Sequence, residues 1–191
     1  SHWKYALPAQ AGNTVRRIGA WFYGCYACTI FVVVVLSFGC LAMLAGRADR
    51  ARRLARFCAR WMFRLAGMPL SVTGLERLPA RSHVLLVNHT SFLDALVLIA
   101  LLPAPPGYTF TTRQEFPLQS LLYPLLRSVR TIVLRHPGET HHSGNVAIMK
   151  SALERGENLL VFPEGQFAPE PGLRPFHSGA FVAAAQADVP I

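Results

Sequence analysis

The stretch HVLLVNHTSFLDALVLIAL, residues 83–101, contains the pattern on which the fold depends. Its aliphatic run VLLV is typical of a strand that is covered on both faces of a sheet. The polar turn NHTS follows, and the apolar residues after it predict a helix over 91–101. A buried strand that leads through a short turn into a helix indicates an α/β domain.

The same alternation continues on both sides of this stretch. We predict strands over 70–73, 83–88, 108–112, 131–135 and 158–162, and helices over 91–101, 117–128 and 142–155. Residues 69–191 are therefore expected to form an α/β domain, with a mixed β-sheet flanked by helices. The chain stops at Val189–Pro190–Ile191, inside what is expected to be one more strand, so we interpret it as a fragment at both ends.

Composition narrows the classes of protein. The 191 residues are 52% hydrophobic and 15% charged, which is too apolar for intrinsic disorder. Four cysteines are too few for a disulfide scaffold. Nineteen Lys and Arg against ten Asp and Glu give a formal charge of +9, which indicates an anionic partner. No stacking-aromatic pattern accompanies the basic residues, so a membrane or phosphorylated lipid is favoured over nucleic acid.

An uncharged run covers residues 18–46, behind an N-terminal segment of residues 1–17. A transmembrane helix needs about 20 apolar residues, whereas the apolar region of a signal peptide usually has about 7–15. We therefore predict a membrane-embedded hydrophobic helix, with a signal peptide as the alternative. Ser37 and Gly39 would permit a bend, so both a spanning and a re-entrant helix stay open.

Residues 47–68 predict a basic amphipathic helix in the lipid interface. Arginines recur every three or four residues on one face, and apolar residues occupy a different arc. The basic positions are Arg53, Arg56, Arg60 and Arg64, and the apolar ones are Leu54, Phe57, Cys58, Trp61 and Leu65. Because seven arginines follow the hydrophobic run, the positive-inside rule places the C-terminal body on the cytoplasmic side of the membrane.

His89 and Asp94 form the first candidate site. Five residues on a helix turn through about 500°, so the two cannot share one helical face. They can pair if His89 lies in the turn and Asp94 reaches back from the first helical turn. The carboxylate would then orient the imidazole as a general base for a substrate hydroxyl. Alternatively, Ser91 and Asp94 form a capping box and His89 is structural.

Phe162–Pro163–Glu164–Gly165 is the second candidate stretch. It ends a buried strand, and open α/β sheets place their sites at the carboxyl ends of their strands. Glycine permits a tight turn and the close approach of a ligand. The alternative is an ordinary turn at the end of a strand.

In this order and spacing, the two stretches resemble the glycerolipid acyltransferase family over residues 70–191. Its N-H-x4-D motif is matched by Asn88, His89 and Asp94, and its F-P-E-G-T-R motif by residues 162–165. Gln166 and Phe167 then replace Thr and Arg. The second family motif is only partly matched, at residues 131–135, where Arg135 fits the final Arg. The fourth, V-P-[IV]-x-P, begins at Val189.

The resemblance implies an O-acyltransferase of phospholipid biosynthesis that moves a fatty acyl group from acyl-CoA or acyl carrier protein to a lysophospholipid hydroxyl. It implies His89 as the base, Asp94 as its partner, and no metal or cofactor. The substrate-binding residues that we expect are Asn88, Arg113, Arg135, Glu164 and Gly165.

The favoured acceptor is 1-acylglycerol-3-phosphate, with Arg135 on its phosphate. Phe167 removes an Arg that the family associates with phosphate, so Arg113 or Arg174 is a candidate replacement. Two alternatives stay open: an acyltransferase for a non-phosphate lyso-lipid such as an amino-acid lipid, and an inactive lipid-binding membrane module. Intact His89 and Asp94 argue against the inactive module.

Overall fold

A computed structural model describes residues 11–91, 93–104, 107–113, 119–135, 139–165 and 172–191. Within them lie four strands, β1 (Val84–Leu86), β2 (Tyr108–Arg113), β3 (Ile132–Leu134) and β4 (Asn158–Val161). They form one sheet in the order β1-β4-β2-β3, and every pairing is parallel. All four strands therefore end at the same edge of the sheet. The predicted α/β fold class is confirmed.

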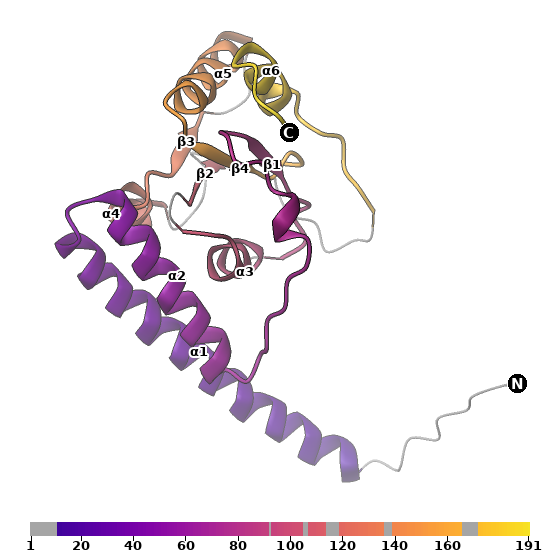
Figure 1. Cartoon of the computed structure of the whole chain (residues 1–191). Coiled ribbons are helices and arrows are strands. Elements are labelled where there is room, and N and C mark those ends of the chain that lie inside the picture. Colours follow the sequence, from indigo (N-terminus) through magenta and orange to yellow (C-terminus); the bar gives the residue numbers. More distant parts are fainter. Residues whose placement is uncertain (1–10, 92, 105–106, 114–118, 136–138, 166–171) are drawn as a thin grey trace, which may run out of the picture.

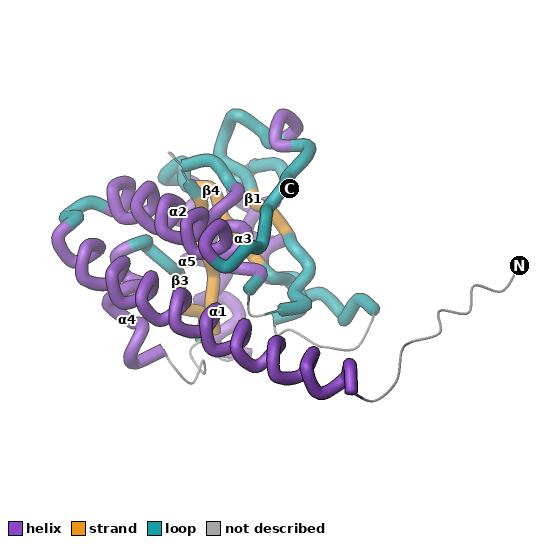
Figure 2. The backbone as a smooth tube through the Cα atoms, turned by 90° about the horizontal axis from the view of Figure 1, so that it is seen from below, coloured by secondary structure: helices purple, strands orange, loops and turns teal. Residues whose placement is uncertain are grey.

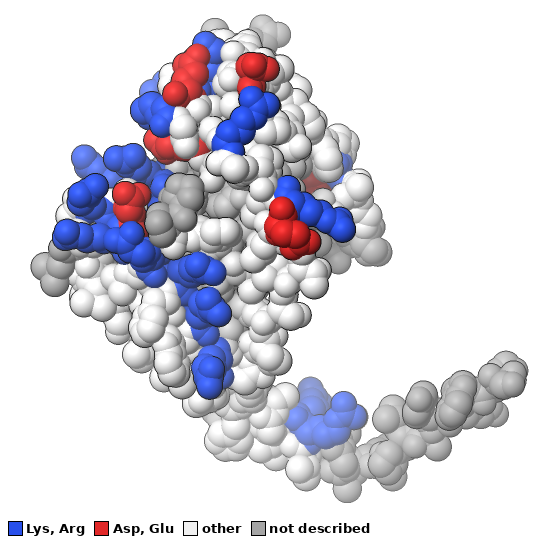
Figure 3. Space-filling view, in the orientation of Figure 1, with Lys and Arg blue, Asp and Glu red and all other residues white. Residues whose placement is uncertain are grey.

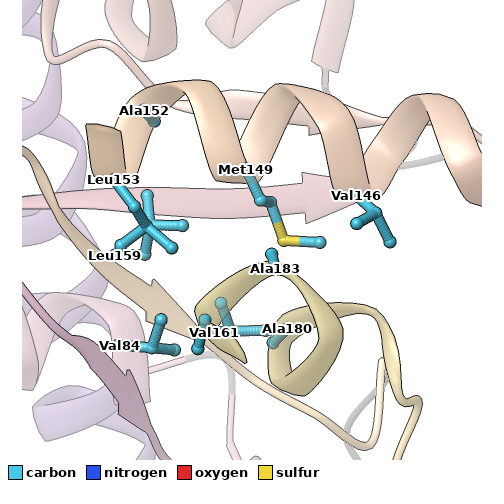
Figure 4. Packing of buried hydrophobic residues seen from close by; sticks show 10 residues of the cluster. Val84, Val146, Met149, Ala152, Leu153, Leu159, Val161, Ala180 and Ala183 are labelled. Atoms are coloured by element: carbon cyan, nitrogen blue, oxygen red, sulfur yellow. The ribbon is translucent and has the colours of Figure 1, made fainter. Parts of the chain in front are cut away.

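Helices cover both faces of this sheet (Figure 1). On one face lie α5 (Glu139–Glu154) and α6 (Gly179–Gln186), and on the other α3 (Asp94–Leu101). A hydrophobic core lies between the strands β1 and β4 and the helices α5 and α6. In it, methionine, leucine and valine side chains pack against alanines of α6, and Figure 4 shows these side chains pointing toward one another. Leu159 and Ala183 in this core are fully buried. Its small alanines let α6 lie close to the sheet.

The N-terminal part is a helical hairpin. Helix α1 (Ala11–Leu44) is followed after a three-residue turn by α2 (Ala48–Leu65), and the two helices lie side by side in both views (Figures 1 and 2). The Tyr23 hydroxyl donates to the carbonyl oxygen of Ala66 over 2.9 Å, so the end of α2 lies level with Tyr23. Helix α4 (Gln119–Ser128) packs against α1 through Leu125.

Helix α2 connects the hairpin to the α/β body. Its buried face consists of small and apolar residues: Ala51, Ala55, Ala59, Met62 and Phe63. At its first turns, the buried guanidinium of Arg52 donates to Thr109 Oγ1 over 2.6 Å and lies 4.0 Å from Glu157 Oε2. Thr109 donates in turn to Glu157 over 2.7 Å. This polar network fastens α2 to the starts of β2 and β4.

The structure corrects several sequence-based predictions. The predicted strand over 70–73 is wrong, because this segment has no strand partner among the described residues and Val72 is 43% exposed. The helix predicted from residue 91 begins at Asp94. Helix α6 was not predicted. Arg56, expected to point to lipid, instead donates over 3.4 Å to the carbonyl oxygen of Ala100, at the end of α3.

Candidate active site

The candidate site lies where β1 and β4 end side by side. Leu86 is in register with Val161, and the Val87 amide donates to the Val161 carbonyl over 3.1 Å. The loop after β1 carries His89, and the loop after β4 carries Glu164. Two stretches that lie 75 residues apart in sequence thus meet at the carboxyl edge of the sheet. This is where open α/β sheets hold their sites.

His89 and Asp94 are in contact, as predicted. The imidazole Nδ1 lies 3.1 Å from Asp94 Oδ2. His89 lies in the turn and Asp94 is the first residue of α3. Because an aspartate oxygen accepts, Nδ1 carries the proton and Nε2 holds the lone pair of a base. The side chains are 19% and 22% exposed, so the pair is held by protein and still reaches solvent.

Asp94 also orders the backbone of the turn. Its Oδ2 accepts the amides of Thr90 and Ser91 over 2.7 and 2.8 Å. Partial burial raises the pKa of the Asp94 carboxyl, but the Ser91 amide, the His89 side chain and the Thr90 amide together outweigh burial, and the pKa is lowered. Asp94 therefore remains ionised at neutral pH. One oxygen atom thus makes both the pairing with His89 and one half of the predicted capping box, the contact with the Ser91 amide. The other half is not formed, because the Ser91 hydroxyl accepts the amide of Leu93 instead of that of Asp94.

Glu164 joins the two loops. Glu164 is a buried residue and is 7% exposed. Oε1 accepts the backbone amide of His89 over 3.2 Å, and Oε2 accepts the backbone amide of Arg174 over 3.3 Å. The turn itself is closed by the Gly165 amide, which donates to Phe162, and Gly165 has a φ of +74°, which favours glycine.

Phe162 supports the imidazole from one face. The two rings stack with centroids 4.1 Å apart and an interplanar angle of 20°. Sequence reasoning used Phe162 only as part of a motif and missed this contact. The contacts of the Thr90 and Arg174 amides were also missed, because backbone partners leave no side-chain signature in a sequence.

Arg113 and Arg135 lie farther along the same edge. Arg135 is exposed and directly follows β3, a strand that lies two positions from β4, about 10 Å away at ordinary strand spacing. Its backbone is held by Asn145 through two hydrogen bonds. Arg113 ends β2, and Asn88 is exposed beside His89. Gln166 and Phe167 lie outside the described residues. The substrate-binding roles of all these residues stay predictions.

No group of three or more His, Cys, Asp or Glu side chains that could hold a metal ion occurs in the described part of the chain. The site instead contains an oriented imidazole, an ionised partner and an aromatic support. This set can accept a proton from a hydroxyl and return it to a leaving group.

Known proteins resemble this chain in sequence over most of its length. A family model described as Acyltransferase matches residues 69–191, which confirms the resemblance. The chain is 29% identical over 195 residues to "1-acyl-sn-glycerol-3-phosphate acyltransferase" of Saccharomyces cerevisiae, covering 91% of this chain and 60% of the relative. It is 30% identical over 141 residues to "Lyso-ornithine lipid O-acyltransferase" of Pseudomonas aeruginosa, covering 73% and 52%. The chain thus spans about half to three-fifths of the length of these relatives.

A solved structure shares the fold. The crystal structure of the 1-acyl-sn-glycerophosphate (LPA) acyltransferase, PlsC, from Thermotoga maritima matches with a TM-score of 0.66 at 18% identity. The match covers 92% of this chain and 74% of that chain, so it includes the helical hairpin as well as the α/β body.

Proposed function

Because the chain belongs to the Acyltransferase family, we propose that it transfers a fatty acyl group from a thioester, acyl-CoA or acyl carrier protein, to the hydroxyl of a lysophospholipid. The observation that carries this proposal is the His89–Asp94 pair at the carboxyl edge of the sheet, 3.1 Å apart. An inactive lipid-binding module would not need a carboxylate that fixes the tautomer of a half-buried imidazole.

The chemistry follows from the proton positions. Nε2 of His89 takes the proton of the acceptor hydroxyl while the oxygen attacks the thioester carbonyl. Asp94 stabilises the imidazolium that results. The tetrahedral intermediate then collapses, the carbon–sulfur bond breaks, and the leaving thiolate takes the proton from the imidazolium. The products are the diacyl lipid and a free thiol, and His89 is neutral again.

The favoured acceptor is 1-acylglycerol-3-phosphate, as in the name of the yeast relative. Arg113 ends β2 and Arg135 follows β3, so both residues stand at the same edge of the sheet as His89 and are the candidates to bind a phosphate. The second candidate is an amino-acid lyso-lipid. It is favoured by the similarity to a lyso-ornithine lipid acyltransferase and by Phe167, which stands where the family has Arg.

The hairpin attaches the enzyme to the membrane. The part of α1 between residues 14 and 42 is apolar enough to span a bilayer, yet α2 with its arginines runs beside it back to Tyr23. Within the described part of the chain, residues 11–22 are the stretch of α1 that extends beyond α2, about 18 Å of helix against a hydrocarbon core of about 30 Å. We therefore favour insertion from one side over a full crossing. By the positive-inside rule, that side is the cytoplasmic one.

A panel of lyso-lipids tests the proposal. The purified chain in vesicles receives labelled acyl-CoA or acyl carrier protein with either lysophosphatidic acid or lyso-ornithine lipid, and products are identified by mass spectrometry. Formation of phosphatidic acid supports the favoured acceptor. Acylation of the ornithine lipid alone supports the second candidate, and no acylated product with any acceptor contradicts the proposed activity.

A further inference from the structure

Glu164 has two backbone partners that come from different parts of the chain. Its side chain is buried, one oxygen accepts the amide of His89 and the other accepts the amide of Arg174. The His89 amide belongs to the residue whose imidazole is paired with Asp94. The carboxyl group thus acts directly on the backbone from which the base projects.

The need for such a contact follows from the loop. Regular pairing between the neighbouring strands ends at Val87, whose amide donates to Val161. His89 lies two residues farther on, outside the sheet. Beyond Val87, the described contacts between the two loops include the Glu164 carboxyl on the His89 amide and the Phe162 ring on the imidazole. These contacts hold the His89 loop and its imidazole against the loop that follows β4.

The geometry also argues against Glu164 as a ligand for the acceptor. Both oxygens face backbone amides, and the residue is 7% exposed. The acidic group of Glu164 would also repel the phosphate of the favoured acceptor. A role through the position of His89 is sufficient to affect the reaction, because a shift of about 1 Å in a reacting group can lower the rate about 100-fold.

We infer that Glu164 is a positioning residue, which holds the His89 loop in place through the backbone, rather than a residue that binds the acceptor. This inference rests on the proposed function, because Glu164 would affect the reaction only through His89, the proposed base. It differs from the prediction made from the family resemblance, in which Glu164 binds substrate.

A double-mutant cycle tests this role. Glu164→Gln keeps the shape but places a donor where one amide needs an acceptor. We expect kcat to fall about 10- to 100-fold, with the KM for the acceptor unchanged within about twofold. In the His89→Ala background, Glu164→Gln should cause almost no further loss, because the group that it positions is absent. A raised acceptor KM, or the same loss in both backgrounds, would overturn the inference.

Glu157→Gln is the matched control. Glu157 is also a glutamate that is mostly enclosed by protein, with a side chain that is 11% exposed, but it lies just before β4, at the opposite edge of the sheet. Glu157→Gln should lower the melting temperature of the protein. It should also change the rate of acyl transfer by the same factor in the wild-type and His89→Ala backgrounds. If Glu164→Gln does not fold, Glu164→Asp, which keeps the charge but shortens the reach, enters the same cycle.

A measurement that needs no activity separates this inference from the proposed function. The imidazole nitrogen signals of His89, identified by their loss in His89→Ala, are recorded by NMR in detergent. They should shift in the Glu164 variant and remain unchanged in Glu157→Gln. Unchanged His89 signals in the folded Glu164 variant would overturn the positioning role even if no acceptor were acylated.

Discussion

Oδ2 of Asp94 accepts hydrogen bonds from two backbone amides and faces the imidazole of His89. One carboxylate thus determines both the conformation of the turn and the tautomer of the base. Asn at this position offers only one acceptor oxygen and can present its amide group to Nδ1 instead. Residue 94 is therefore where a change of a single atom type has the largest expected effect on the chemistry.

Asp94→Asn should lower kcat about 10²- to 10⁴-fold, the usual contribution of a general base, because the imidazole loses its fixed tautomer. The stability effect should depend on pH. Because folding lowers the pKa of Asp94, its ionised form stabilises the protein above the ordinary aspartate pKa of about 4, and this contribution is lost as the pH falls through the folded pKa. The melting temperatures of wild type and variant should differ most near pH 7 and converge in acid. A constant difference would contradict this account.

Phe162→Leu tests the ring stack. Aromatic pairs contribute about 0.5–1.5 kcal/mol beyond area, so losing the contact with His89 should lower kcat roughly threefold to tenfold. The KM for the acceptor should change little. Phe110→Leu, in the same apolar cluster on β2, is the control for lost packing and should spare kcat. Equal effects of the two substitutions would remove Phe162 from the set of residues that support the base.

At the scale of elements, α2 is fixed to the sheet by a buried polar network. The Arg52 side chain is 10% exposed and reaches Thr109, Glu157 and the Val129 carbonyl. Arg155 Nε also lies 3.1 Å from Glu157, so Glu157 keeps a cationic partner when Arg52 is removed. The Thr109 hydroxyl and the Val129 carbonyl, by contrast, lose the donor that Arg52 supplies, and an acceptor left without a donor away from water costs stability.

Arg52→Met should lower the free energy of unfolding by about 3 kcal/mol, because the Thr109 hydroxyl and the Val129 carbonyl each lose the donor that Arg52 supplies. Thermal unfolding in detergent should show a decrease of roughly 6–12 °C. Arg53→Met is the matched control, since Arg53 is the neighbouring residue on the exposed face of α2. The melting temperature of this variant should stay near that of wild type. A similar decrease in both variants would show that charge on α2, rather than the buried network, is responsible.

The elements also show how far sequence reasoning reaches. β1 and β4 are continuous aliphatic runs, so the pattern predicts them. The segment over 70–73, with the sequence LSVT, alternates apolar and polar residues as a half-buried strand does, but a strand also needs a partner, which only the folded chain supplies. α6, with the sequence GAFVAAAQ, is short and lacks a polar face, so no helical period is evident.

The contacts of the candidate site also divide into those that the sequence predicts and those that it does not. The His89–Asp94 contact is local and follows from a five-residue spacing. The partners of Glu164 lie 75 and 10 residues away and are backbone amides. Neither is visible in a sequence pattern, because every residue except proline has an amide.

At the scale of the whole molecule, positive charge and exposed apolar side chains lie next to each other on the helical hairpin. Lys and Arg form a row along α2 in Figure 3. Between these arginines, Phe57, Trp61 and Leu65 are 60%, 45% and 50% exposed. Arginines beside exposed aromatic and aliphatic side chains are typical of a helix that lies in a lipid interface.

Replacing Arg53, Arg60 and Arg64 by Gln should weaken binding to anionic vesicles. At about 1 kcal/mol for each arginine, the loss is roughly 150-fold at low salt and smaller in high salt. Binding to neutral vesicles should change little, because α1 and the apolar part of α2 are unaltered. Arg77→Gln, in the short 3₁₀ helix Leu75–Arg77, is the control. Equal loss on neutral vesicles would argue against an electrostatic contact with lipid.

The central claim is that this chain transfers acyl groups with His89 as the base. The most direct test compares acyl transfer by wild type and His89→Ala in vesicles, with a labelled acyl donor and lysophosphatidic acid. Circular dichroism and vesicle binding show whether the variant is folded and attached. The account predicts a rate about 10²- to 10⁴-fold lower in a folded, membrane-bound variant. Near-normal transfer by His89→Ala would contradict it.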